Sequence, residues 1–149
     1  MTDEIDDPLL FTLFNEIGII SQLSNAAFEK VLPDGLKVSH FSVLNHLARL
    51  GDNKSPSSLA SAFQVTKGAM TNTLGRLEAR GLVKVKADPV DGRGKRVFIT
   101  AKGRKARNRS IAELAPLLTE LAKAFPEKKA AAALPFLKDL RVYLDQARD

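Results

Sequence analysis

The sequence predicts a mainly α-helical fold that carries one small β-hairpin. Three observations predict it. Apolar residues recur at helical spacing along most of the 149 residues. Ser55 and Thr66 precede two short helical stretches, and both are residue types that favour helix starts. Residues 83–99 instead alternate with a period of two on either side of a stretch rich in turn-forming residues.

The composition favours a soluble cytoplasmic protein whose single domain spans residues 1–149. Hydrophobic residues make up 44% of the chain, which is enough for a packed core. No apolar run is long enough to cross a bilayer, so we expect no membrane partner. The acidic tail at residues 1–8 is unlike a secretory signal. Cysteine is absent, which excludes disulfides and thiolate metal sites.

The first third of the chain predicts two helices. In the first, over residues 9–32, the apolar residues share helical spacing: Leu10, Leu13, Phe14, Ile17, Ile20, Leu23, Ala27, Phe28 and Val31. The Pro33-Asp34-Gly35 triplet is a turn signal that ends it. We expect the second helix to begin after Ser39 as N-cap and to end at Gly51.

Residues 55–81 predict two short helices joined by a tight turn. Ser55 caps the first, with Pro56 at the first helical position, where its missing N–H costs nothing. Thr66 caps the second, and a glycine, Gly81, ends it. Met70, Leu74 and Leu77 form the inner stripe of this second helix. The pair forms a helix-turn-helix.

A hairpin and two long helices complete the chain. Strands at residues 83–86 and 95–99 flank the turn-rich stretch and form a wing. Thr100 caps a helix that extends to about residue 125, and Pro126 opens the last helix. The predicted fold class is therefore mainly α with a small β-wing. A winged helix-turn-helix lobe occupies residues 37–103, with dimerisation helices at 9–32 and 104–149.

The terminal helices carry wide apolar stripes, although the lobe between them has its own small core. Such stripes suit packing against a second copy of the chain. The other interpretation is that they pack on each other within one chain. We favour a homodimer, because a two-fold pair would also place the two copies of the second helix of the helix-turn-helix, the recognition helix, one turn of DNA apart.

Positive charge is concentrated in one third of the chain. Residues 64–110 hold thirteen basic and three acidic residues, a net charge of +10, whereas the whole chain carries +6. A local excess of this kind attracts polyanions by releasing their condensed counterions. Charge alone fits a solvated basic face equally well, so the interpretation depends on the motifs within this segment.

The second helix of the pair has an outer face that suits contact with double-stranded DNA. Lysine and arginine can bind phosphates or guanine edges, asparagine can bind adenine, and threonine can contact a thymine methyl group. Gly68 would let the backbone approach the duplex closely, although an interior glycine disfavours a helix. An ordinary solvent-exposed helix face is the alternative. The candidate DNA-binding residues of this helix are Thr66, Lys67, Gly68, Thr71, Asn72 and Arg76.

The wing supplies a second set of candidate DNA-binding residues, Arg93, Lys95 and Arg96. An arginine between glycines at a hairpin tip can enter a minor groove, where narrow A·T tracts strengthen the negative potential. The alternative is a mobile, solvated turn. We expect Asp91 to brace the wing by pairing with a nearby arginine rather than to contact DNA.

Residues 55–103 resemble the winged helix-turn-helix of the MarR family of bacterial transcriptional regulators. Three stretches carry the resemblance: residues 76–83 (RLEARGLV), residues 88–93 (DPVDGR) and residues 99–103 (ITAKG). The order and lengths of the flanking helices agree as well, so the resemblance covers nearly the whole chain. It implies an obligate homodimer that binds a pseudo-palindromic operator, usually as a repressor. Many members release DNA when a small anionic aromatic compound binds.

The resemblance also assigns roles to single residues. It gives Arg93 the wing-tip role and Asp91 the bracing role. Members that sense oxidants depend on a cysteine near the first helix, and this chain has none. Members that bind zinc use clusters of His, Cys and Glu, whereas only His40 and His46 are present here, so we expect no metal and no cofactor. His40 lies where an effector pocket would be expected, but a surface or capping histidine is the commoner interpretation.

Other function classes fit the sequence less well. We find no nucleophile–base signature, phosphate-binding glycine loop or metal-ligand spacing, so we do not expect an enzyme. A sequence-nonspecific architectural DNA-binding protein would share the fold and the charge, and it stays the main alternative. A protein–protein module on a winged scaffold would not need basic residues on both helix and wing.

Overall fold

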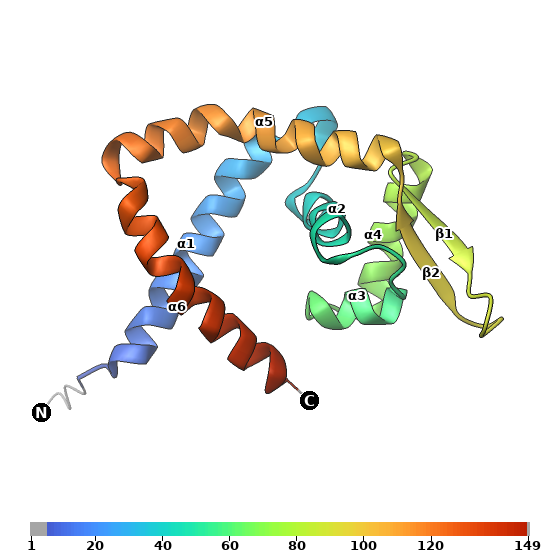
Figure 1. Ribbon diagram of the computed structural model, residues 1–149, viewed down its shortest axis with the longest axis horizontal. Helices are drawn as coiled ribbons and strands as arrows, with labels where there is room; N and C mark the ends of the chain where they lie inside the picture. Colours follow the sequence, from blue (N-terminus) through green and yellow to red (C-terminus); the bar gives the residue numbers. More distant parts are fainter. Residues whose placement is uncertain (1–5, 149) are drawn as a thin grey trace, which may run out of the picture. The chain divides into compact units, whose positions relative to one another are not determined.

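The structure is a computed structural model that describes residues 6–148. The predicted acidic tail lies in part outside these residues. By its internal contacts the chain forms two units, one up to Glu113 and the other from Leu114 onward. The prediction of a mainly helical fold with a small β-wing is confirmed, because the described chain is helical apart from one antiparallel pair of strands (Figure 1).

The first unit begins with helix α1 (Leu9–Val31), a 3-10 turn (Pro33–Gly35) and helix α2 (Val38–Leu50). Helix α2 starts before Ser39, so the prediction of Ser39 as N-cap was wrong. Lys37 takes the N-cap position, and its backbone N–H donates to Nδ1 of His40 at 3.4 Å. His40, the third residue of the helix, thus bonds the backbone N–H of the N-cap residue, which is the role of the N3 side chain in a capping box.

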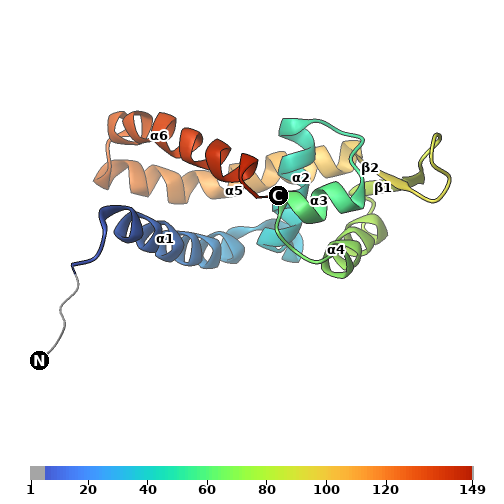
Figure 2. The same ribbon diagram turned by 90° about the horizontal axis from the view of Figure 1, so that it is seen from below.

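Helices α3 (Pro56–Ala62) and α4 (Lys67–Ala79) lie side by side and form the predicted helix-turn-helix (Figure 2). Both predicted caps are confirmed. The Ser55 hydroxyl accepts the N–H of Ser58, and the Thr66 hydroxyl accepts the N–H of Ala69, each at 3.1 Å. Helix α4 has Arg80 as its C-cap, and the next residue, Gly81, has a φ of 71° that suits glycine and stops the helix.

The wing is the antiparallel pair β1 (Val83–Ala87) and β2 (Lys95–Ile99). Val83 lies opposite Ile99, and Val85 lies opposite Val97. The loop after α2 extends this sheet, because Lys54 exchanges two backbone hydrogen bonds with Val97. The hairpin projects away from the helices (Figure 1). Hydrogen bonds from Val97 and Ile99 join β2 to the loop between α2 and α3.

Helix α5 (Ala101–Ala124) begins directly after β2. The Thr100 hydroxyl accepts the N–H of Gly103 at 3.0 Å, which confirms its predicted capping role, and donates to the carbonyl oxygen of Gly81 at 2.6 Å. Gly103 packs so closely on Leu82 that an added Cβ would overlap the Leu82 carbonyl. These contacts join the start of α5 to the end of α4.

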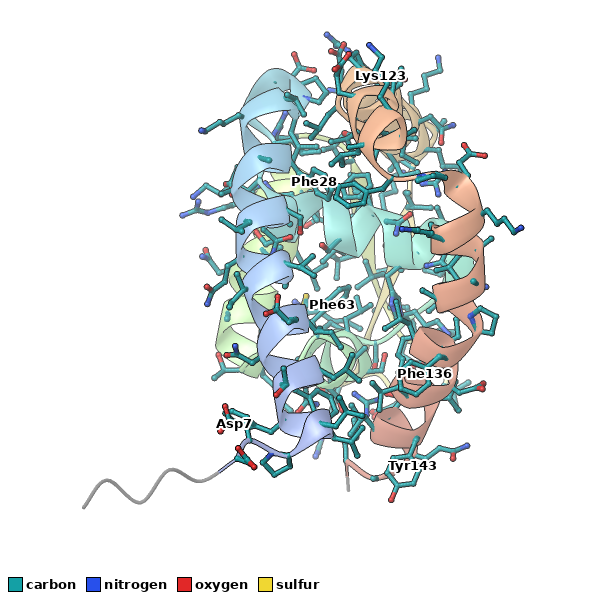
Figure 3. The ribbon with its side chains drawn as sticks, turned by 90° about the vertical axis from the view of Figure 1, so that its left-hand side faces the viewer. Asp7, Phe28, Phe63, Lys123, Phe136 and Tyr143 are labelled. Atoms are coloured by element: carbon teal, nitrogen blue, oxygen red, sulfur yellow. The ribbon has the colours of Figure 1, made fainter. Side chains whose placement is uncertain are left out.

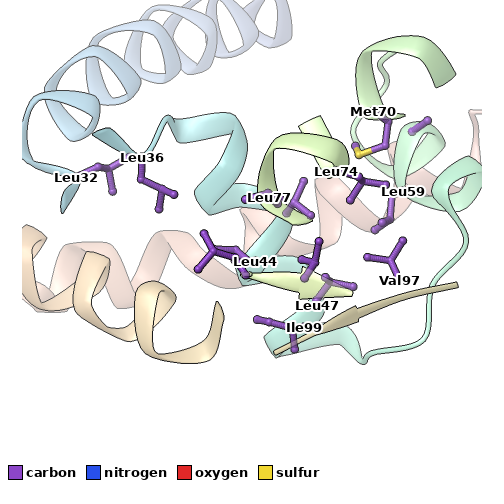
Figure 4. Packing of buried hydrophobic residues seen from close by; sticks show 14 residues of the cluster. Leu32, Leu36, Leu44, Leu47, Leu59, Met70, Leu74, Leu77, Val97 and Ile99 are labelled. Carbon is purple, nitrogen blue, oxygen red and sulfur yellow. The ribbon is translucent and has the colours of Figure 1, made fainter. Parts of the chain in front are cut away.

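The core of the first unit is built from the inner faces of the elements already described. Side chains from α2, α4 and β2 converge there, with Leu44, Leu47, Leu77 and Ile99 close together in the close-up (Figure 4). The predicted inner stripe of α4 is confirmed, because Met70, Leu74 and Leu77 are all buried. The outer face of α4 is thereby left to solvent.

Helix α1 has no buried residue, and several of its large apolar side chains are exposed: Leu9, Leu10, Phe11, Phe14, Ile19, Ile20 and Leu23. The second unit holds the end of α5 and helix α6 (Glu127–Gln146), which also exposes apolar side chains, among them Phe136 and Tyr143 (Figure 3). Among the helices of the described residues, none has the length and apolar character that a bilayer span requires.

Candidate nucleic-acid interface

The outer face of helix α4 is polar, small and open. All six candidates on or next to this helix are exposed: Thr66, Lys67, Gly68, Thr71, Asn72 and Arg76. The Thr66 hydroxyl accepts the N–H of Ala69 as the helix cap, so its main role is to stabilise the start of α4. An added Cβ at Gly68 or at Gly75 would meet nothing within 4 Å. The packing of the chain therefore gives no reason for glycine at either position.

A cleft of about 770 Å³ separates α4 from the wing. Thr71, Gly75 and Glu78 line it from α4, since their spacing places them on one side of the helix. Arg93 and Lys95 line it from the wing, and Ser55 lies at the start of α3. The structure thus brings predicted residues of helix and wing around one concave surface.

The three basic candidates of the wing have different surroundings. Arg93 and Lys95 are exposed, and within residues 6–148 the Arg93 guanidinium has no hydrogen-bond or ion-pair partner. Arg96 is half-buried. Its Nε lies 3.0 Å from Oδ2 of Asp88, and its Nη1 lies 3.4 Å from the carbonyl oxygen of Asn53. Arg96 is therefore occupied by contacts within the chain, whereas Arg93 is free to reach a partner.

The wing brace differs from its prediction. Asp91 does hold the turn, because its carboxylate accepts the backbone N–H of Arg93 at 3.1 Å. The expected ion pair with an arginine is formed by Asp88 instead, and no such pair of Asp91 is found within the described residues. The register of the hairpin explains the difference. Lys86 lies opposite Arg96, so Asp88 lies near Arg96 across the hairpin, while Asp91 lies in the turn and bonds the backbone two residues ahead.

Asp88 also organises the turn itself. Its Oδ1 accepts the backbone N–H groups of Val90 at 2.9 Å and Asp91 at 3.3 Å. These two bonds, followed by the partner Arg96, lower the pKa of the Asp88 carboxyl below its usual value. Asp88 was not among the predicted site residues, although an aspartate followed by proline at the start of a turn is a recognised signal for this bonding pattern.

His40 is 7% exposed and lies at the start of α2. Burial lowers its pKa, and the neighbouring Arg80 lowers it further, so both favour the neutral imidazole. Its Nδ1 is already bonded to the N–H of Lys37. These contacts describe a capping histidine, and the effector role stays a prediction.

Comparison with known proteins identifies the family. The model of the MarR family matches residues 34–94. The transcriptional regulator HosA of Escherichia coli O111:H- is 30% identical over 92 residues, covering 62% of this chain and 67% of that protein. The regulator BldR of Sulfolobus solfataricus is 28% identical, with a TM-score of 0.71 over 87% of this chain and 94% of that one.

A mutant MarR of E. coli, solved in complex with operator DNA, shows the same fold. Its TM-score is 0.72 at 24% identity, over 90% of this chain and 99% of that chain. The resemblance inferred from residues 55–103 and the winged helix-turn-helix fold are thus confirmed. The chain belongs to the MarR family and is a transcriptional regulator with a DNA-binding fold.

Proposed function

We propose that the protein is a homodimeric repressor that binds a pseudo-palindromic, double-stranded operator and releases it when a small effector binds. One observation carries the DNA-binding part. The open polar face of α4 and the guanidinium of Arg93, which has no partner among residues 6–148, border the same cleft, inside a segment of net charge +10. Helix and wing would then contact adjacent grooves of one duplex.

The exposed apolar side chains of α1 and α6 support the dimer. A chain that exposes this many large apolar side chains on two helices is unusual for a monomer, since such patches mark interaction surfaces. A second copy is the simplest partner, because a symmetric operator needs two recognition helices. Release by an effector, with an aromatic acid as first candidate, rests on the family resemblance.

Selection of bound sequences from random DNA tests this proposal. We expect an inverted repeat whose half-sites lie one helical turn apart, with two chains bound per site. Sedimentation of the free protein checks the dimer independently. Near-equal affinity for operator and random DNA would favour the architectural alternative, and a folded monomer in solution would contradict the repressor model.

A further inference from the structure

The few acidic residues around the candidate interface share one kind of partner. Asp52, Glu78, Asp88 and Asp91 are the acids between residues 52 and 110. Each of their carboxylates accepts at least one backbone N–H from the wing segment. Asp52 accepts the N–H of Ile99, and Glu78 accepts that of Val85. Asp88 accepts the N–H groups of Val90 and Asp91, and Asp91 accepts that of Arg93. All four acids between residues 52 and 110 thus bond the backbone of the wing.

Glu78 is the member that joins the wing to the recognition helix. It lies in the last turn of α4, and its Oε2 accepts the N–H of Val85 in β1 at 2.8 Å. Val97 directs both of its backbone groups to Lys54. Val85, directly opposite Val97, must therefore direct its N–H away from β2, to the outer edge of the sheet. Glu78 occupies that edge.

Electrostatics alone disfavours an acid at position 78. The C-terminal end of a helix carries partial negative charge, so a carboxylate there lowers helix stability. Glu78 also lines the cleft that Arg93 and Lys95 border, where negative charge would repel phosphates. The hydrogen bond to Val85 is the contact that accounts for a carboxylate at this place.

We propose that Glu78 is a positioning residue that holds the wing at a fixed angle to helix α4, so that both contact DNA together. This inference rests on the proposed DNA-binding function. Loss of the Glu78 acceptor frees the β1 edge, and the wing then samples orientations in which Arg93 misses its groove. Glu78 itself contacts no DNA.

Two substitutions separate position from charge. Glu78→Ala and Glu78→Gln both remove one negative charge, but only glutamine keeps an oxygen that accepts the Val85 N–H. We expect Glu78→Ala to bind operator DNA about tenfold more weakly, and Glu78→Gln to bind as tightly as the wild type or more tightly. A role as surface charge predicts instead that both variants bind more tightly. That result, or equal weakening of both, would overturn the proposal.

A label at the tip of the wing tests the same inference without DNA. The chain has no cysteine, so Val90→Cys, at a position 94% exposed, accepts a single nitroxide. We expect Glu78→Ala to sharpen the electron paramagnetic resonance spectrum of this label, and Glu78→Gln to leave it unchanged. An unchanged spectrum in Glu78→Ala would contradict the positioning role, whether or not the protein binds an operator.

Glu78→Lys is a further variant, for which the charge role and the positioning role predict opposite changes in DNA affinity. A charge role predicts the tightest binding of the series, since lysine adds a cation beside the cleft. The positioning role predicts weak binding, because lysine cannot accept a hydrogen bond. Circular dichroism and thermal melting establish that each variant is folded. Wild-type protein that binds no duplex would refute the proposed function, while the label spectra would still decide the role of Glu78.

Discussion

Arg93 and Arg96 are three residues apart in the wing, yet their contacts give them different roles. Asp88 and the carbonyl oxygen of Asn53 hold Arg96, whose side chain is 37% exposed. Within the described residues Arg93 has no such partner, although its backbone is fixed by Asp91. A fixed backbone with a free guanidinium is the arrangement that groove insertion needs.

We therefore expect Arg93→Ala to weaken operator binding by about 1–3 kcal/mol while the protein stays folded. The substitution removes a proposed DNA contact, and among residues 6–148 it breaks no side-chain hydrogen bond or ion pair. Titration in a gel-shift assay measures the loss. Arg141→Ala, in α6, removes the same charge from an exposed position outside the candidate DNA interface and serves as the matched control, with sedimentation to check that this variant keeps the proposed dimer. Equal affinities of Arg93→Ala and this control would contradict the role of the wing tip.

At the scale of the elements, helix α4 is less stable than it could be, because its outer face carries a glycine. Gly75 lies in the helix interior, where glycine costs about 1 kcal/mol relative to alanine. Since a Cβ there meets nothing within 4 Å, the chain itself would accept alanine. The missing side chain is explained if a duplex approaches the helix backbone at this point.

Gly75→Ala is therefore expected to raise the free energy of unfolding by about 0.5–1 kcal/mol and to weaken operator binding. Urea denaturation and DNA titration measure the two effects. Gly18→Ala is the control, because Gly18 also lies in a helix with open space at its Cβ position but outside the candidate DNA interface. It should raise stability without loss of DNA affinity. Sedimentation of this variant checks that the dimer is retained, since α1 belongs to the proposed dimer surface. Tighter DNA binding by Gly75→Ala would rule out close approach at this position.

Local signals predicted the elements of the lobe well. The capping hydroxyls of Ser55, Thr66 and Thr100 act over three residues, so they are visible in the sequence and are confirmed. The start of helix α2 was placed wrongly because its N-cap, Lys37, is not one of the residue types that favour this position. The preference of serine for N-caps therefore placed the start at Ser39, two residues too late.

Contacts between elements were harder to predict. The partner of Arg96 depends on strand register, and the partner of Glu78 depends on which edge of β1 faces helix α4. Neither follows from spacing along the chain. The basic residues of the interface and the bracing Asp91 were thus predictable from the sequence, while the roles of Asp88 and Glu78 required the structure.

For the whole molecule, stability should depend on pH through its two histidines. Burial is the main cause that lowers the pKa of both His40 and His46 below 6.5. The positive charges of Arg80, Lys37 and Arg76 lower the pKa of His40 further, and Glu29 opposes them. Lys54 and Arg49 lower the pKa of His46 further. Because the folded pKa is the lower one, the unfolded chain binds protons first as pH falls.

The free energy of unfolding should therefore be greatest above about pH 7.5 and decrease as pH falls to about 5.5. Urea denaturation across this range gives the slope. In the double variant His40→Gln/His46→Gln the slope should be much smaller, since glutamine does not titrate but still offers an acceptor to the Lys37 N–H. Equal slopes in both proteins would assign the pH dependence to other groups.

The salt dependence of DNA binding can report both a phosphate contact and the number of chains on the operator. Lys67 is exposed at the start of α4, and we expect it to bind a phosphate. Each phosphate contact contributes about 0.9 to the slope of log affinity against log salt concentration. In a homodimer Lys67→Gln removes that contact twice, so the slope should fall by about 1.8.

Titrations between about 50 and 200 mM salt measure this change. Lys128→Gln, an exposed lysine in α6, is the control and should leave the slope as it is in the wild type. A decrease of about 0.9 would mean that only one chain of each complex uses Lys67, which a symmetric complex does not permit. An unchanged slope would show that Lys67 is solvated in the complex. The phosphate contacts would then be assigned to Arg76 and the basic residues of the wing.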